Sequence, residues 1–214
     1  MLPFTPEVFF ANMAQYNEAI WPAQAVAYVL GLVIVLLLFR PTSQSSRLIA
    51  ALLAGAWIWI GVVYHLKYFA TINFAAPLFG LAFITAGLLI AWSGVITRRV
   101  TFRFRADAAG FAGLTFVTFA IVVYPLLGWL AGHAWPRVAM FGVAPCPTTI
   151  FTMGLLLLTE GRTPPHLAII PVLWSLVGGS AVWLLGVPED LALPIAGLSG
   201  LGLILWKNRA APRP

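Results

Sequence analysis

The stretch Pro145-Cys146-Pro147-Thr148-Thr149 brings together a thiol, two hydroxyl groups and two prolines. Cys146 is the only cysteine, so it cannot form an intramolecular disulfide. Because proline lacks a backbone N–H, the two prolines predict a helix that starts at Pro147 or is broken there. The free N–H groups of Thr148 and Thr149 would then attract an anion. The alternative is an ordinary helix start that is capped by threonines and contains a small buried thiol.

A second set of polar residues lies where apolar segments end. Tyr64-His65-Leu66-Lys67 closes one such segment, and His133 and Arg137 lie in a later loop. Charges close to membrane depth are costly unless paired or hydrated, so they are candidates for function. We expect an outer vestibule whose ligand-binding residues are Gln24, Tyr64, His65, Lys67, Cys146, Thr148 and Thr149. In the alternative, the lysine and arginine reach back to water and Tyr64 belongs to an interfacial aromatic belt.

A metal site is a weaker hypothesis. Cys146 with His65 or His133 could bind copper or zinc. Metal ligands in one sequence are usually closer together and more numerous than these three residues. The sequence contains no phosphate-binding glycine loop, zinc-protease helix or nucleophile elbow, so we expect no enzymatic activity and assign no cofactor. A membrane-embedded thiol or metal enzyme that uses Cys146 is the third alternative.

The composition places these residues in a membrane. Hydrophobic residues make up 61% of the chain and charged residues 8%, whereas a soluble domain has about a quarter charged residues. Only helices and closed barrels satisfy their backbone groups in lipid, and apolar stretches of roughly 17–22 residues without alternation indicate helices. We therefore predict an all-α, polytopic helical bundle with seven membrane-spanning helices. They are expected at residues 21–39, 48–64, 74–92, 108–130, 148–158 (extended upstream to 142), 167–185 and 191–206.

Residues 5–20 precede these spans and differ from them. Phe9, Met13 and Tyr16 recur at helical spacing, opposite Asn12 and Glu18. This pattern predicts a short amphipathic helix that lies on the membrane surface. Residues 1–10 lack the basic stretch of a cleavable signal peptide, so none is expected.

The basic residues predict the orientation. The net charge of +6 would suit nucleic-acid binding if it were clustered on one domain, but it is distributed over the helix ends. Only Lys67 and Arg137 fall in one set of loops. By the positive-inside rule the other set is cytoplasmic, which places the C-terminus inside and, with seven spans, the N-terminus outside. That set comprises Arg40, Arg47, Arg98, Arg99, Arg103, Arg105, Arg162, Lys207, Arg209 and Arg213. We therefore expect membrane lipid as the partner and no nucleic acid.

Two parts of the chain share landmarks. Pro22 and Gly31 match Pro145 and Gly154 at one offset. Residues 21–92 and 142–206 would then be two three-helix units with the same orientation, joined by a linking helix at 108–130. The alternative is that membrane helices reuse proline and glycine at turns and close contacts. This parallel 3+1+3 topology is similar to that of the SWEET and PQ-loop transporters. A Pro-Gln dipeptide is missing, and its nearest approach is Pro22-Ala23-Gln24.

Three short stretches carry a second resemblance: Phe4-Thr5-Pro6-Glu7, Tyr16-Asn17-Glu18 and the run from Pro145 to Gly154. Together they resemble a family of small bacterial multi-pass membrane proteins to which no function is assigned. The resemblance implies a bacterial inner membrane and transfers no residue roles.

The function expected from these features is a transporter or channel-like protein for a small solute or ion. The alternative is a non-catalytic scaffold or an accessory subunit of a larger membrane complex. Small residues four positions apart, as at Gly128 and Gly132, suit close helix contacts within the bundle or in a homo-oligomer. No span interior is expected to contain an acidic residue, which argues against a proton pump with a carboxylate relay.

Overall fold

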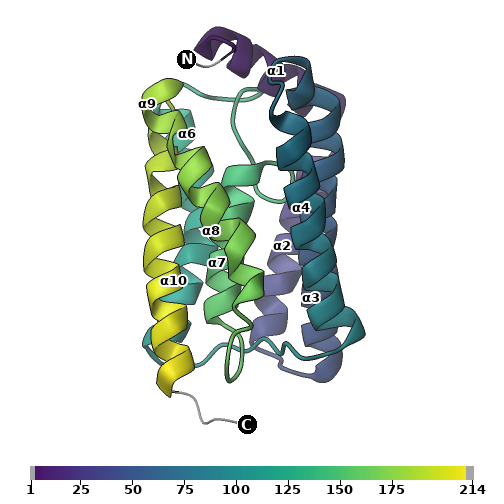
Figure 1. The fold of residues 1–214 in the computed structure, drawn as a ribbon, viewed down its shortest axis with the longest axis vertical. Coiled ribbons are helices and arrows are strands. Elements are labelled where there is room, and N and C mark those ends of the chain that lie inside the picture. The colour runs from purple at the N-terminus through teal and green to yellow at the C-terminus, as the bar shows by residue number, and fades with distance from the viewer. Residues whose placement is uncertain (1–2, 211–214) are drawn as a thin grey trace.

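The computed structural model describes residues 3–210, and the regular secondary structure in this range is helical apart from a single antiparallel bridge between Phe102 and Thr159. The long helices run along one axis, and α1 lies across one end of the bundle (Figure 1). The helical segments are α1 (Pro6–Ala19), α2 (Ala23–Leu38), α3 (Ser43–Trp59), η1 (Ile60–Tyr68), η2 (Phe69–Thr71), α4 (Ala76–Ile90), η3 (Ala91–Ile96), α5 (Ala108–Thr118), η4 (Phe119–Val123), α6 (Tyr124–Leu130), α7 (Pro145–Leu157), α8 (His166–Gly179), α9 (Ala181–Leu184), η5 (Pro188–Leu191) and α10 (Ala192–Ala210).

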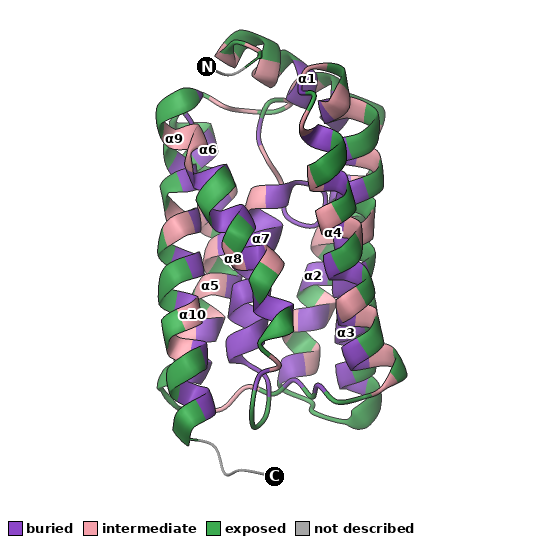
Figure 2. Ribbon diagram, in the orientation of Figure 1, coloured by how far each residue is buried: buried purple, intermediate pink, exposed green. Residues whose placement is uncertain are grey.

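Several of these segments join into continuous helices that are long and apolar enough to cross a bilayer. There are five in the described residues, and six if α1 and α2, which are bent by 80°, count as one span. Leucine, valine and isoleucine side chains cover their outer faces, which are largely exposed (Figure 2). A bundle with an apolar exterior of this extent is suited to lipid. The chain is therefore a multi-pass membrane protein. The five helices are Ser43–Thr71, Ala76–Ile96, Ala108–Leu130, His166–Leu184 and Pro188–Ala210.

The seven-span count is not confirmed, because α7 is short. Its 13 residues extend for about 20 Å, whereas the hydrocarbon core is about 30 Å thick. The span predicted at 21–39 corresponds to α2, which counts as a span only together with α1, whereas the span expected at 108–130 coincides with a continuous helix. Pro125 lies inside that helix and follows a π-helical turn at Phe119–Val123. Proline cannot donate the helical hydrogen bond, and its ring needs additional space against the preceding turn. The wider π-helical turn provides that space, so the helix continues.

Helix α7 occupies the centre of the bundle. All of its residues from Pro147 to Leu157 are buried, and it packs against α5, α8 and α10 (Figure 2). Trp57 of α3 donates a hydrogen bond from Nε1 to Thr152 Oγ1 at 2.9 Å and stacks on Phe83. Because lipid does not contact α7, this helix can be shorter than the bilayer and can begin inside it.

The prediction of a helix break at Pro145–Pro147 is wrong. Helix α7 begins at Pro145, so both prolines lie in its first turn. The N–H groups of a first turn have no helical acceptor, and proline therefore costs nothing there. Thr148 and Thr149 come at or after the fourth position, where carbonyl acceptors within the helix are in place. They cannot provide the free N–H groups that were expected of them.

Lys207 lies where α7 ends, although the sequence placed it among the cytoplasmic surface charges. It is buried, and its Nζ donates to Thr159 O at 2.8 Å and to Thr159 Oγ1 at 2.7 Å. The carbonyls of Leu156 and Leu157 are 3.4 and 3.3 Å away. A helix C-terminus has unpaired carbonyls and a partial negative charge, so a cation stabilises it. Lys207 therefore fixes the lower end of α7.

The loops at the two ends of the bundle differ in charge. The α2–α3, η3–α5 and α7–α8 connections lie together with the end of α10, opposite α1 (Figure 1). They contain the basic residues that the positive-inside rule assigned to the cytoplasm, except that Arg213 lies outside the described residues. The internal repeat is not confirmed. Helix α7 packs extensively against α10, whereas the corresponding contact between α2 and α4 is slight at most.

Candidate functional site

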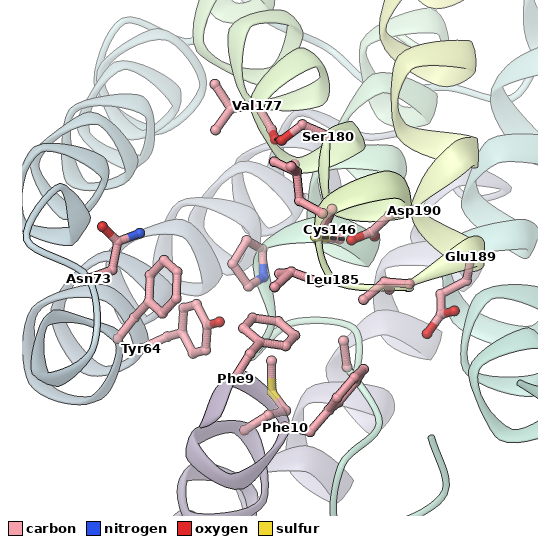
Figure 3. A pocket seen from close by; sticks show the side chains of 18 of the residues that line it. Phe9, Phe10, Tyr64, Asn73, Cys146, Val177, Ser180, Leu185, Glu189 and Asp190 are labelled. Carbon is pink, nitrogen blue, oxygen red and sulfur yellow. Dashed lines mark hydrogen bonds between the residues drawn. The ribbon is translucent and has the colours of Figure 1, made fainter. Parts of the chain in front are cut away.

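A cavity of about 140 Å³ lies below α1, at the end of the bundle opposite the basic loops. Its walls come from both halves of the chain, and its floor includes Pro145 and Cys146 at the start of α7 (Figure 3). Two larger hollows have volumes of about 340 and 330 Å³; the first is lined by apolar side chains and glycines, and the second by four apolar side chains with Thr115 and Thr118. A specific solute site needs a few convergent polar groups, which favours the first cavity.

Two adjacent carboxylates face this cavity. Glu189 and Asp190 belong to the short helix η5 before α10, and only 4% and 3% of their surfaces are exposed. Asp190 Oδ1 accepts a 2.5 Å hydrogen bond from the Tyr124 hydroxyl, and its Oδ2 accepts one from Cys146 Sγ at 3.5 Å (Figure 3). The carboxylate therefore lies beside the N-terminal turn of α7, where the helix dipole stabilises negative charge.

Glu189 is only partly hydrogen-bonded. Its Oε1 lies 3.1 Å from His133 Nδ1, and the His133 ring stacks on Phe10 at 4.2 Å. Gly128 lets the carboxylate approach α6, since a Cβ at that position would lie 3.0 Å from Oε1. Within residues 3–210, Glu189 Oε2 has no hydrogen-bond partner although it is buried. A buried carboxylate oxygen without a donor is costly, so Oε2 is available to accept a hydrogen bond from a molecule in the cavity.

Aromatic rings form part of the remaining wall, together with aliphatic side chains. Phe9 contacts Phe69 edge-on, and Phe69 stacks on Tyr64 at 5.5 Å. On another wall Trp174 meets Phe79 at 5.4 Å. Trp174 is 9% exposed, and no residue in the described part of the chain accepts a hydrogen bond from its Nε1. The site thus combines two acidic groups with several aromatic rings and aliphatic side chains.

The structure brings together some of the residues that the sequence proposed for ligand binding. Tyr64 and Cys146 line the cavity. His65 does not line the cavity; its ring lies behind the wall and packs against Phe83 and Trp174, at 4.7 and 5.2 Å. Lys67 is exposed, with Nζ 5.4 Å from the centre of the Tyr68 ring.

Of the other three ligand candidates, Gln24 and Thr148 make local hydrogen bonds, and the hydroxyl of Thr149 has no partner in residues 3–210. Gln24 is buried, and its Nε2 donates to the Asn17 carbonyl at 2.8 Å, which links α2 to α1. The Thr148 hydroxyl donates to Ala144 O at 2.7 Å and accepts from the Gly142 N–H at 2.9 Å. Thr149 is buried next to it along α7. None of the three lines the cavity.

The proposed metal ligands do not converge. Cys146 is paired with Asp190, His133 with Glu189, and His65 lies among aromatic rings. Throughout residues 3–210, no group of three or more His, Cys, Asp or Glu side chains has a metal-binding arrangement.

Sequence reasoning missed the acidic pair, Tyr124 and Trp174. The expectation that acidic side chains stay out of the bundle interior is wrong, because Glu189 and Asp190 are buried. A signal was present: they are two of only six acidic residues in the chain, they are adjacent, and they directly precede an apolar span. Charges are so rare in this sequence that such a pair indicates a buried role.

Helix α1 is fixed over the cavity by polar contacts, although the sequence predicted that Asn12 would face water. Asn12 is buried and donates to Tyr68 O at 3.0 Å. Tyr16 donates through its hydroxyl to Val143 O at 2.7 Å. Asn17 Nδ2 donates to Pro136 O and Val138 O at 2.6 and 2.8 Å. These bonds hold α1 and the 131–144 connection together above α7.

We expect Asn17→Ala to loosen this end of the protein. Two buried carbonyls would lose their donor, which costs about 2 kcal/mol of stability. The thermal midpoint in detergent should fall, and a water-soluble thiol reagent should modify Cys146 faster. Gln15→Ala removes an exposed amide from the same helix and should change neither quantity. Equal behaviour of the two variants would contradict a fixing role for Asn17.

The stretches that suggested a bacterial family meet at this site. Phe4 lines the cavity, Tyr16 and Asn17 hold the segment above it, and Pro145 and Cys146 form part of its floor. No curated protein and no solved structure matches the chain. A family model described as "Family of unknown function (DUF6064)" matches residues 6–213, which is nearly the whole chain. The chain therefore belongs to the DUF6064 family.

Proposed function

We propose that the protein is a small transporter or channel-like protein of a bacterial inner membrane, with its N-terminus outside and its C-terminus in the cytoplasm. The observation that carries this proposal is a cavity with two buried carboxylates inside a bundle whose exterior is apolar. Ionisable groups at membrane depth are costly and mark solute or ion pathways. A scaffold that only packs against partner helices has no need of them.

The short helix α7 supports the same proposal. It starts at the cavity floor, and its N-terminal turn lies against Asp190. Helices that begin inside the bilayer direct their partial charges at a central site in many transporters. Below the cavity, the buried length of α7 and the Lys207 contacts close the path to the basic end. The structure thus fits a state that is open toward the outer face and closed toward the cytoplasm.

Cys146 provides a direct test, because it is the only cysteine and lines the cavity. A membrane-impermeant thiol reagent added to right-side-out vesicles should modify it. If the protein alternates between two states, the reagent should also reach Cys146 from the cytoplasmic side in inside-out vesicles, at a slower rate. Cys146→Ser has no cysteine and serves as the background control.

The side of the membrane from which the reagent reaches Cys146 distinguishes a transporter from an accessory subunit. Modification from both sides supports a transport pathway through the cavity. Modification from the outer side alone would show a one-sided pocket and would overturn the transport proposal in favour of an accessory subunit that binds a ligand. A thiol that is unreactive from both sides would contradict an open vestibule.

A further inference from the structure

The composition of the cavity wall identifies the chemistry of its ligand. Glu189 and Asp190 are buried side by side, and Asp190 already receives two hydrogen bonds from the protein. Glu189 receives one contact, from His133, and its Oε2 is unpartnered among the residues that the structure describes. The ligand therefore has to supply a hydrogen-bond donor at this oxygen. A donor that also carries positive charge offsets the burial of the acidic pair.

The neighbouring rings favour the same type of ligand. Phe9, Tyr64 and Trp174 line the cavity together with the carboxylates. Aromatic faces attract cations, and the attraction grows when water is excluded. An anion would meet two carboxylates and the negative faces of the rings, so the cavity disfavours it.

Arg137 is the one basic side chain that lines this cavity in residues 3–210. It is exposed at the rim, and no ion pair joins it to Glu189 or Asp190 in the described structure. The cavity lining therefore contains two buried acidic side chains and one exposed basic side chain. Lys67, the nearest lysine along this end, points over the Tyr68 ring and does not line the cavity.

The volume limits the size of the ligand. A cavity of about 140 Å³ is close to one that holds a benzene molecule, which corresponds to roughly six to eight heavy atoms. We propose that the cavity binds a small organic cation with an ammonium group, which Glu189 holds directly and the aromatic rings surround. This assignment rests on the proposed function, because it names the substrate class of the same cavity.

Three probes of nearly equal shape test the assignment: benzylammonium, benzyl alcohol and benzoate. Binding to the full-length protein in detergent or nanodiscs can be followed by tryptophan fluorescence, since Trp174 lies in the wall. Benzylammonium should bind to wild type and benzoate should not. Benzyl alcohol reports the partitioning of the ring alone, and sodium chloride titrations report whether an inorganic cation competes.

Variants distinguish a direct contact from a change in folding. Glu189→Gln keeps the size of the side chain and removes its charge, and it should weaken benzylammonium binding by at least about tenfold. Glu18→Gln removes an exposed acidic charge from the same end and should leave the affinity unchanged. Thermal midpoints of both variants show whether the fold is intact. A stable Glu189→Gln protein that binds benzylammonium like wild type would overturn the assignment, as would stronger binding of benzoate.

Arg137→Ala provides a second criterion. Removal of a rim cation should leave benzylammonium affinity equal or increase it. A loss of affinity would show that Arg137 holds part of the ligand, which contradicts a site that binds only a cation.

The experiments distinguish a failure of the ligand assignment from a failure of the transport proposal. Binding of benzylammonium without flux in proteoliposomes retains the ligand class and rejects transport. Access to Cys146 from both sides without benzylammonium binding retains transport and rejects the ligand class.

Discussion

Lys207→Met should lower the free energy of unfolding by about 3 kcal/mol, the largest stability loss that we expect from a single charge removal in this protein. The lysine donates to the carbonyl and the hydroxyl of Thr159, and the carbonyls of Leu156 and Leu157 lie close to its Nζ. Methionine fills a similar volume but has no donor, so these buried acceptors would lose their partner. It also removes the positive charge from the C-terminal end of the α7 dipole.

Thermal unfolding in detergent measures this loss, and a shift of about 10 °C corresponds to it for a chain of this size. The sequence supplies a matched control, because Lys67 is the only other lysine. It is exposed and contacts one aromatic ring, so Lys67→Met should cost less than about 1 kcal/mol. If Lys207→Met were as stable as Lys67→Met, the contacts at the end of α7 would not contribute to stability.

Lys207 also shows which features the sequence could predict. Hydropathy reports whether a stretch can enter lipid, and it located the long helices, including 108–130, because their length and composition are local properties. The positive-inside rule treats a lysine near a helix end as a surface charge. Burial of Lys207 depends on carbonyls about 50 positions earlier in the chain. No local pattern contains that information.

For the candidate site too, local sequence features were predictable and long-range contacts were not. The sequence placed Tyr64 and Cys146 at one end of the bundle, and both line the cavity. Polar residue type alone could not separate them from His65, which follows Tyr64 in the helix and packs among aromatic rings without lining the cavity. In η1 the turns are π-helical, so the faces of this segment do not follow the usual period. The role of Asp190 required knowledge that Tyr124 and Cys146 come within hydrogen-bonding distance.

Charge placement along α7 connects these two ends. The polypeptide segment that begins at η5 supplies Asp190 near the positive N-terminal end of α7 and Lys207 at the negative C-terminal end. Each charge has the opposite sign to the partial charge at the helix end that it contacts, which stabilises the helix. The short helix α7 is therefore held at both ends by a single neighbouring segment. If the protein transports a solute as proposed, a movement of α10 relative to α7 would change the cavity floor and the opposite end of α7 together.

Gly154→Ala should destabilise the protein by about 2 kcal/mol, because α7 and α5 approach each other at this residue. A Cβ on Gly154 would lie 2.6 Å from the Gly113 carbonyl oxygen, and one on Gly113 would lie 2.7 Å from the Gly154 oxygen. Both obstacles are backbone atoms, so the two helices have to separate. Gly55→Ala is the matched control, since its Cβ meets no atom within 4 Å and alanine favours a helix by up to about 1 kcal/mol.

The double variant Gly113→Ala/Gly154→Ala tests whether the two glycines form one contact. After the first alanine has separated the helices, the second meets less resistance, so the combined loss should be smaller than the sum of the two single losses. Thermal or denaturant unfolding in detergent gives the three values. The separation also displaces the start of α7, and benzylammonium affinity should fall in both single variants while Gly55→Ala retains it. Strictly additive losses with unchanged affinity would show that the crossing of α5 and α7 does not position the cavity floor.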